Sequence, residues 1–396
     1  MNFFNLLYQL LIAHRLSPSD FAAFNSLLAI LMILSSPLGP LQVSVAKYSA
    51  EFNARNQTDK IKILLSRLFK ITSLIGLIVL LLFSFLSFYI IDKLKIPSVF
   101  SGYILALLIS FSFVSPVFGG VMLGLELFAW LMAVSLITGL LKLLLAVFFI
   151  WLGFNITGAL AALFVSAFIG LILYYFPLKN FFTLGRLRDG INFKEIFIYI
   201  FPVAISSFCY MVLTNLDMVL VKYFFPVQES GYYSIAQMVG KISLFFPVAI
   251  CIVMFPRTSG LSARNMDTLS MLKRSLLYAS ALCLITILGY NLFPVFTLKI
   301  LTGKPLPNSV ILGRLFSLSM SFFALINILS TYFVSIKDLR FIKYLVLFTG
   351  LQVLAIILFH NSLIQVQLIL CINAILLFSI HLILAYKKGT VPAIAN

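Results

Sequence analysis

Two charged residues lie deep inside apolar stretches of this chain. Asp217 falls within the apolar run 196–224, and Lys241 falls within the run 230–256. A charge at the centre of a membrane-spanning helix costs roughly 2.5–3.5 kcal/mol on insertion scales, so a buried charge usually marks a site. Two roles are open for these residues: a functional site in a wet interior, or an ion pair that only joins two helices.

Polar side chains recur at helical spacing around both charges, three or four residues apart on one face of each expected helix. They are Ser206, Tyr210, Thr214 and Asp217 in the first run, and Tyr233, Gln237 and Lys241 in the second. Such a stripe is expected where a helix faces a bundle interior or a water-filled cavity and not lipid. Tyr232 and Tyr233, at the outer end of the second run, are further candidates for stacking on a sugar ring.

The composition is that of a polytopic membrane protein. The chain has 396 residues, of which 62% are hydrophobic and only 10% are charged, whereas soluble domains are about one quarter charged. The formal net charge is +17, but the basic residues are scattered between apolar segments and form no long basic run. We therefore expect membrane lipids as partners and no nucleic acid.

Apolar windows long enough to cross a hydrocarbon core of about 30 Å recur from end to end. They predict about twelve helices, at 1–13, 21–46, 63–91, 99–124, 129–151, 156–177, 196–224, 230–256, 271–298, 308–334, 341–360 and 363–386. The first is short for a span, and we expect a truncated or misassigned start. Prolines at 37, 40, 116, 202 and 247 fall inside these helices and predict bends.

The distribution of Lys and Arg predicts the orientation. Basic residues concentrate in 47–70, 179–194, 257–274, 337–343 and 387–388, and the intervening loops hold few. We expect these segments and both termini on the cytoplasmic side of the cell membrane.

A shift of 208 positions aligns the two halves of the chain. It places Pro18 on Pro226, Pro97 on Pro305 and Lys179 on Lys387. Six helices followed by six of the same orientation form a parallel repeat with a pseudo-twofold axis along the membrane normal. The predicted organisation is an N-terminal six-helix bundle at 1–178, a cytoplasmic linker at 179–195, a C-terminal six-helix bundle at 196–388 and a tail at 389–396.

No constellation of catalytic residues is apparent. An enzyme needs a nucleophile with a base, paired carboxylates or a metal cluster, and Asp217 is the one acidic residue deep in an apolar run. The four cysteines, Cys209, Cys251, Cys283 and Cys371, lie in apolar runs without a CxxC pair. We predict no catalytic residue, no metal ligand and no enzymatic activity.

Several short motifs resemble a known family. They are Arg15-Leu16-Ser17-Pro18 with Asp20-Phe21 and Phe24, Ala46-Lys47-Tyr48 with Ala50-Glu51-Phe52, and Asn215, Asp217, Pro226, Gly231-Tyr232-Tyr233, Lys241 and Phe255-Pro256-Arg257. The pattern is similar to that of the oligosaccharide flippases, the polysaccharide-biosynthesis membrane proteins of the multidrug/oligosaccharidyl-lipid/polysaccharide exporter superfamily. Ala23 departs from the family, which usually has Gly there.

The resemblance implies two bundles that open alternately to either side of the membrane, and a substrate made of a polyprenyl pyrophosphate that carries a short glycan. A pyrophosphate needs cations in a wet cavity. Candidate cations are Lys241, Lys142, Arg15 and Arg314, and candidate partners for sugar hydroxyls are Asn25, Thr214, Asn215 and Gln237. Asp217 would orient Lys241, or would bind a coupling proton or Na⁺. Glycan polymerases or glycosyltransferases are expected partners.

Three other functions are alternatives. A cation-coupled small-molecule exporter of the same fold would use Asp217 as its coupling site. A membrane-bound glycan polymerase or ligase would need a large outer loop with catalytic residues, and every predicted outer loop is short. A membrane scaffold without transport activity would leave the buried charges unexplained.

Overall fold

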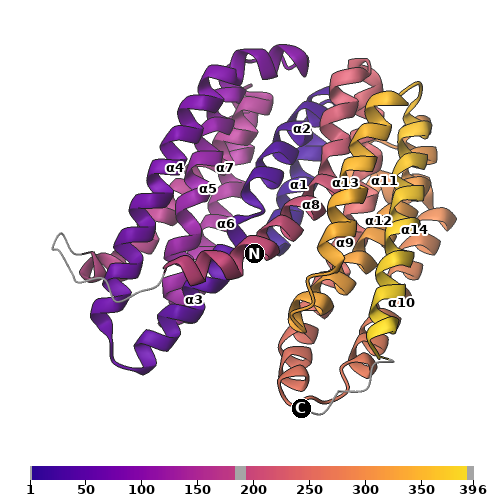
Figure 1. Ribbon diagram of the computed structural model, residues 1–396. Helices are drawn as coiled ribbons and strands as arrows, with labels where there is room; N and C mark the ends of the chain where they lie inside the picture. The colour runs from indigo at the N-terminus through magenta and orange to yellow at the C-terminus, as the bar shows by residue number, and fades with distance from the viewer. Residues whose placement is uncertain (1, 183–192, 390–396) are drawn as a thin grey trace. The chain divides into compact units, whose positions relative to one another are not determined.

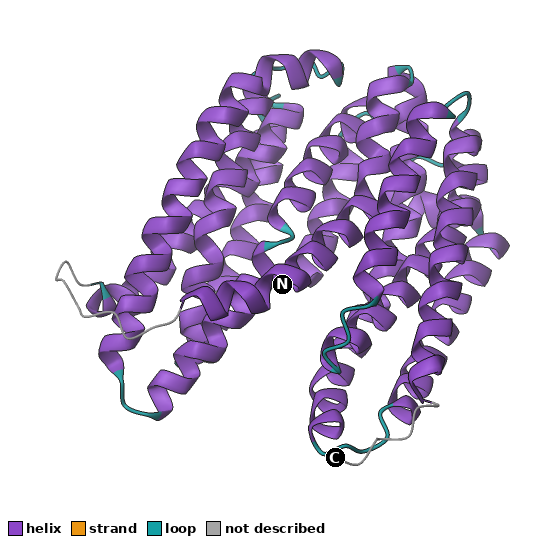
Figure 2. Cartoon of the chain, viewed as in Figure 1, coloured by secondary structure: helices purple, strands orange, loops and turns teal. Residues whose placement is uncertain are grey.

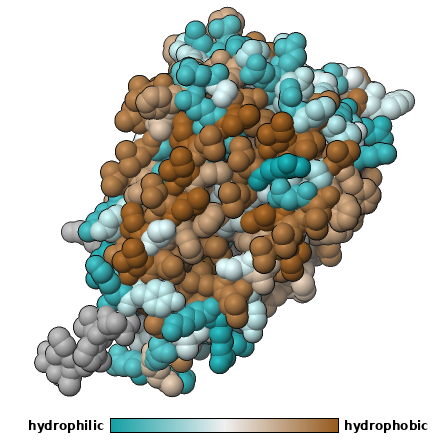
Figure 3. Space-filling view, turned by 90° about the vertical axis from the view of Figure 1, so that its right-hand side faces the viewer, coloured by the Kyte–Doolittle hydropathy of each residue, from teal (hydrophilic) through white to brown (hydrophobic). Residues whose placement is uncertain are grey.

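The computed structural model describes residues 2–182 and 193–389, and α-helices account for almost all of them, with no strand in these ranges (Figures 1 and 2). The predicted all-α fold is thus confirmed. By length and hydropathy, 11 of the described helices can cross a membrane. On the face shown in Figure 3, apolar side chains cover the middle and polar side chains gather at the top and bottom, as expected for a protein embedded in a bilayer.

The chain divides into two compact units, an N-terminal unit of Met1–Phe208 and a C-terminal unit of Cys209–Asn396. The boundary lies inside helix α8. Helix α8 begins at Phe193, directly after the undescribed residues 183–192, so part of the predicted linker at 179–195 lies outside the described residues.

The N-terminal unit is built from seven helices, a short 3₁₀ turn and the first half of α8. Their bounds are α1 Asn2–Arg15, α2 Pro18–Ser35, α3 Leu38–Ala54, α4 Thr58–Lys93, α5 Phe100–Gly124, α6 Phe128–Trp151, α7 Asn155–Leu178, η1 Lys179–Phe181 and α8 Phe193–Phe224. Helix α5 packs against α3, α4 and α7, and α6 packs against α7 and α1 (Figure 1).

The C-terminal unit comprises the rest of α8 and six further helices. Their bounds are α9 Val227–Ala263, α10 Leu269–Leu292, α11 Pro294–Thr302, α12 Pro307–Ser335, α13 Phe341–Leu358 and α14 Leu363–Gly389. Helix α12 is the centre of this unit, because it packs against α9, α10 and α14. Its central position buries more than half of its most apolar window.

Two of the predicted helices are each divided in the structure. The predicted helix 21–46 is interrupted at Ser36-Pro37, where α2 ends and α3 begins. Proline lacks an N–H donor and its ring opposes a preceding helical turn, so the sequence SSPLGP ends a helix where only a bend was predicted. The predicted helix 271–298 is likewise divided, because Pro294 begins the separate helix α11.

The order and bounds of the helices follow the 208-residue repeat. The shift moves α7, at 155–178, onto 363–386, and α14 covers Leu363–Gly389. It moves α5, at 100–124, onto 308–332, and α12 covers Pro307–Ser335. The repeat is not uniform, because the single helix α9 stands where the shift places α2 and α3, and α10 and α11 stand where it places α4.

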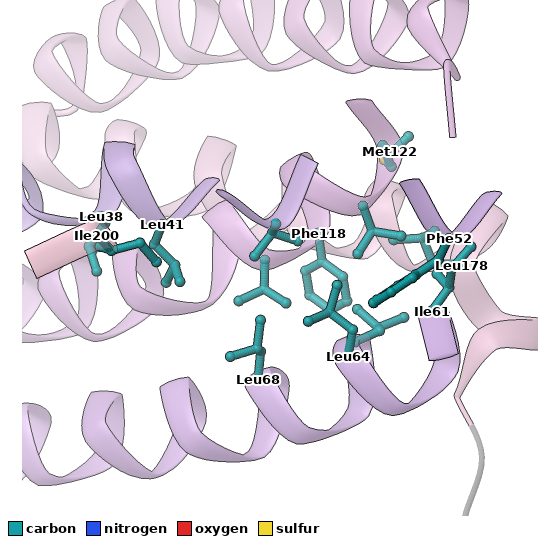
Figure 4. Close-up of a cluster of buried hydrophobic side chains, with 14 residues drawn as sticks. Leu38, Leu41, Phe52, Ile61, Leu64, Leu68, Phe118, Met122, Leu178 and Ile200 are labelled. Atoms are coloured by element: carbon teal, nitrogen blue, oxygen red, sulfur yellow. The ribbon is translucent and has the colours of Figure 1, made fainter. Parts of the chain in front are cut away.

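A cluster of buried apolar side chains forms the core of the N-terminal unit at α3, α4 and α5 (Figure 4). Ile61, Leu64 and Leu65 of α4 are fully buried in it. Leu38 and Leu41 of α3 belong to the same cluster, and so does Ile200, from the first half of α8. The start of α8 is thus part of this core.

Glycine allows α3 and α5 to approach closely. A Cβ atom added to Gly124 of α5 would lie 2.4 Å from Cβ of Ser49 and 2.6 Å from the carbonyl oxygen of Ala46 in α3. Non-bonded heavy atoms do not approach so closely. A side chain at this position would force the two helices apart.

Candidate functional site

Asp217 lies in the C-terminal half of α8 and is completely buried. The hydroxyl of Tyr233 donates a hydrogen bond of 2.8 Å to Oδ2 of Asp217, and the side-chain amide of Gln237 donates to the same oxygen at 3.3 Å. Tyr233 and Gln237 occupy successive turns of α9. The spacing that predicted polar faces on these two helices therefore corresponds to a contact between them.

A third helix reaches the same carboxylate through Tyr233. The amide nitrogen of Gln367, in α14, donates a hydrogen bond of 2.8 Å to the hydroxyl of Tyr233. We call Asp217, Tyr233, Gln237 and Gln367 the Asp217 cluster. Within the described part of the chain, the buried carbonyl oxygens of Gln237 and Gln367 have no hydrogen-bond partner. The cluster thus combines a carboxylate with two oxygen atoms whose hydrogen bonds are not satisfied.

Lys241 lies one turn beyond Gln237 on α9 and is half-buried. It interacts electrostatically with Asp217. Among the residues that the structure describes, however, it forms neither an ion pair with Asp217 nor a hydrogen bond. An ion pair that only joins α8 and α9 is therefore absent from this part of the chain, and the side-chain donors to Asp217 are Tyr233 and Gln237.

A second polar chain crosses the C-terminal unit next to the Asp217 cluster. Gln352 of α13 donates to the carbonyl oxygen of Leu213 at 2.9 Å, and Asn373 of α14 donates to Gln352 at 2.9 Å. Our sequence reasoning missed Gln352, Gln367 and Asn373. The available signal was an amide side chain within a long apolar run, which is costly unless a partner exists.

Thr214 and Asn215 use their hydrogen bonds locally. The Thr214 hydroxyl donates to the carbonyl oxygen of Tyr210 at 2.9 Å, and the Asn215 amide donates to Thr214 and to the carbonyl oxygen of Met211. Both residues are buried. They lie in α8, within one helical turn of Asp217.

Two further residues named in the sequence analysis lie in α12 and α9. Arg314 is exposed in the second turn of α12 and lies outside the Asp217 cluster. Tyr233 is completely buried against Asp217 and Phe316. It therefore does not present its ring for sugar stacking, and that interpretation of Tyr233 is wrong.

Lys142 lies in α6 of the N-terminal unit and is 8% exposed. Its ammonium donates to Oδ1 of Asn5 in α1, and it lies 5.3 Å from the centroid of the Tyr8 ring. The Tyr8 hydroxyl donates in turn to the carbonyl oxygen of Ala159 in α7, at 2.6 Å. Lys142 thus connects α6 to a helix that precedes it by more than a hundred residues.

The other two predicted residues of this unit lie apart from Lys142. Arg15 is the last residue of α1 and is exposed. Asn25 is buried in α2. Neither is among the residues that surround Lys142.

A cavity of about 330 Å³ lies beside Lys142 within the N-terminal unit. Side chains from α1, α2, α5, α6 and α7 line it. They include apolar residues such as Leu28, Phe111 and Leu163, and hydroxyl residues such as Ser112, Thr138 and Ser166. Its volume is at the lower end of the range for small-molecule sites.

Metal ligation by the usual side chains has no support in the described ranges. No group of three or more His, Cys, Asp or Glu residues converges there. The four cysteines are free and buried. The chemistry that these arrangements offer is binding by charge and hydrogen bonds inside two helix bundles.

Solved structures with the same fold are transporters and flippases. An inward-facing multidrug resistance MATE family transporter of the MOP superfamily is similar over 98% of this chain and 96% of its own, with a TM-score of 0.75 and 14% identity. The lipid II flippase MurJ, in an inward closed conformation, is similar over 98% of this chain and 86% of its own, with a TM-score of 0.73 and 17% identity. These neighbours confirm the predicted fold class.

Sequence comparison gives the family. The uncharacterized membrane protein MJ1375 of Methanocaldococcus jannaschii is 24% identical over 215 residues, and the chain spans about half the length of this curated relative (51%). The sequence pattern of polysaccharide biosynthesis proteins matches residues 1–262 of the 396, which confirms the resemblance noted in the sequence. This protein therefore belongs to the polysaccharide biosynthesis protein family.

Proposed function

We propose that this protein is a flippase in the cytoplasmic membrane of a prokaryote. Its substrate is a polyprenyl pyrophosphate that carries a short oligosaccharide, which it moves to the outer leaflet by alternating access. Cell-surface polysaccharide synthesis then consumes the product, and glycosyltransferases and glycan polymerases are the partners. Membership of the polysaccharide biosynthesis family and the fold shared with a lipid II flippase support this function.

One observation in the C-terminal unit carries the proposal. Lys241 is a cation in an apolar helix, and the nearest carboxylate, Asp217, accepts its hydrogen bonds from Tyr233 and Gln237. A lysine in hydrocarbon is costly unless it meets an anion or water. The ammonium of Lys241 has its donors available in the described structure, and a pyrophosphate is an anion that needs such donors.

The Asp217 cluster is a candidate binding site for a coupling ion. Moving an anionic substrate outward is opposed by the membrane potential, at about 2.3 kcal/mol per charge for 100 mV, if the cell interior is negative. A proton or Na⁺ that binds Asp217 would supply energy for the cycle. Asp217 with the unsatisfied carbonyl oxygens of Gln237 and Gln367 is a set of oxygen atoms of the kind that Na⁺ or a proton requires.

The same cluster favours a second candidate function, a cation-coupled exporter of small molecules. One MATE transporter structure shares the fold as closely as the flippase does, with a TM-score of 0.75 against 0.73. In such an exporter Asp217 would be the coupling site, and no pyrophosphate would be recognised. The two functions differ in the role of Lys241, which binds the pyrophosphate only in the flippase.

The deciding experiment measures flipping of a fluorescent polyprenyl-pyrophosphate oligosaccharide in proteoliposomes. We compare the unaltered chain with Lys241→Ala and with Lys93→Ala, which removes an exposed lysine at the end of α4. We expect flipping by the unaltered chain and by Lys93→Ala, and at least a tenfold lower rate for Lys241→Ala. Equal flipping by all three proteins would contradict the role of Lys241, and no flipping by any of them would favour the exporter.

A second measurement tests the ion. Asp217→Asn keeps the shape and one acceptor for Tyr233, but removes the charge that would hold a proton or Na⁺. We expect flipping to lose its dependence on an imposed proton or Na⁺ gradient. In an exporter, the same variant would abolish gradient-driven efflux of small cationic compounds.

A further inference from the structure

The cavity beside Lys142 is separate from the residues assigned to flipping in the C-terminal unit. It lies within the N-terminal unit, and Lys142 is the one charged side chain among the described residues that line it. A buried cation next to an open volume needs an explanation, because a charge in an apolar interior is costly without a counter-ion.

Two groups beside Lys142 can attract an ammonium ion. Oδ1 of Asn5 can only accept a hydrogen bond from it, and the Tyr8 ring presents an electron-rich face at 5.3 Å. Both groups attract a cation. The hydrogen bond from Tyr8 to Ala159 holds that ring in place. An ammonium ion at this position therefore has one acceptor and one aromatic ring beside it.

Neither of these groups neutralises the charge. Asn5 and Tyr8 are uncharged, and no Asp or Glu lines the cavity in the described structure. An ammonium ion has three donors, and those not used by Asn5 are available to an oxygen atom in the cavity. The natural counter-ion is a ligand that enters this volume.

The hydroxyl side chains that line the cavity indicate which class of ligand it can bind. The hydroxyls of Ser112, Thr138 and Ser166 donate to carbonyl oxygens of their own helices, at 2.6–2.9 Å. Their oxygen atoms remain as acceptors, so they suit a ligand that carries a hydroxyl hydrogen. The monoanion of a phosphate monoester, which prevails below its second pKa of about 6, has both the anionic oxygen for Lys142 and a hydroxyl for these acceptors, whereas a carboxylate has only the first.

Apolar side chains complete the lining and suit a hydrocarbon chain. We infer that the cavity of the N-terminal unit binds the phosphate monoester of a single-chain amphiphile, with its anionic oxygen on Lys142. A volume of about 330 Å³ accommodates the phosphate and part of the chain. This site does not depend on the proposed flipping activity.

Binding in detergent tests the inference without any transport step. The purified chain is titrated with radiolabelled decyl phosphate at about pH 5.5, where the monoester is mainly the monoanion, with decanoate and decanol as competitors. We expect one saturable site per chain, displaced by unlabelled decyl phosphate at least tenfold more strongly than by decanoate, and not by decanol. Equal displacement by decanoate would overturn the assignment to a phosphate, and displacement by decanol would show that charge is not recognised.

Variants locate the site. We expect Lys142→Met to weaken decyl phosphate binding at least tenfold, and Lys93→Met, which removes another lysine that lies over a tyrosine ring, to leave it unchanged. Ser112→Leu, which fills the cavity and keeps Lys142, should also weaken binding. Unchanged binding by both Lys142→Met and Ser112→Leu would overturn the inference. Lys241→Ala should bind normally, so a failure of flipping and a failure of this site are distinguishable.

Discussion

The carboxylate of Asp217 is stabilised by a small number of donors, and each of them matters. A hydrogen bond to a charged group contributes about 1.5–3 kcal/mol to stability. If only one partner is removed, the other stays buried without a hydrogen bond, and this lowers stability more than replacing both partners by apolar groups. Tyr233 is the donor with the shortest distance, and it is also the acceptor for Gln367. Removing its hydroxyl disturbs both contacts.

Tyr233→Phe should therefore lower the free energy of unfolding by roughly 2–3 kcal/mol. The matched control is Tyr232→Phe, the same substitution one position earlier on α9, at a residue outside the Asp217 cluster. Thermal unfolding of the two variants in the same detergent gives the comparison. If both variants unfold at the temperature of the unaltered chain, the Asp217 cluster contributes little to stability.

At the scale of elements, close approach of helices depends on single glycines. Gly124 has Ser49 and Ala46 of α3 within 2.6 Å of where its Cβ atom would lie. Gly350 of α13 has no atom within 4 Å of the corresponding position. The two glycines therefore differ in packing, although both are helical.

Gly124→Ala should lower the free energy of unfolding by roughly 1–3 kcal/mol, because the added methyl group pushes α3 away from α5. Gly350→Ala should raise it by about 0.5–1 kcal/mol, because alanine is the better helix former and nothing obstructs its methyl group. Chemical unfolding of both variants measures the difference. Similar effects at the two positions would contradict the close packing of α3 and α5.

The division of α2 from α3 shows which features of a helix can be predicted from the sequence and which cannot. Serine, proline and glycine at 35–40 indicated a bend in the chain, but the apolar run extends on both sides of this segment. Hydropathy reports burial in lipid and does not report backbone hydrogen bonds. The end of a helix inside an apolar run was therefore predicted only as a bend.

At the scale of the molecule, α4 is long enough for both of its ends to lie outside the hydrocarbon core. A helix of 36 residues is about 54 Å long at 1.5 Å per residue, and the core is about 30 Å thick. The positive-inside pattern predicts that Thr58 lies in the cytoplasm and Lys93 lies outside. This helix gives a direct test of orientation.

Thr58→Cys should react with a membrane-impermeant maleimide only after the cells are opened, and Lys93→Cys should react in intact cells. Both positions are exposed at the surface of the chain. The four native cysteines are buried, which keeps the background labelling low. The reverse labelling pattern would place the termini outside.

The fold and the centre of the C-terminal unit could be predicted in large part from the sequence. The length of the apolar runs predicted the helices, and the spacing of polar residues placed Tyr233 and Gln237 on the same face of α9. The partner of Lys142 could not be predicted, because Asn5 is 137 residues away and an amide has no periodic pattern of its own. Contacts between distant helices depend on how the bundle packs, and single-chain patterns do not contain that information.

The place of α8 in two units has a consequence for biosynthesis. Ile200 completes an apolar cluster with Leu38 and Leu41, but it lies in the helix that continues into the C-terminal unit. A nascent chain that ends before this helix exposes part of that cluster. The ribosome must therefore translate well past α7 before the first half of the protein can finish folding in the membrane.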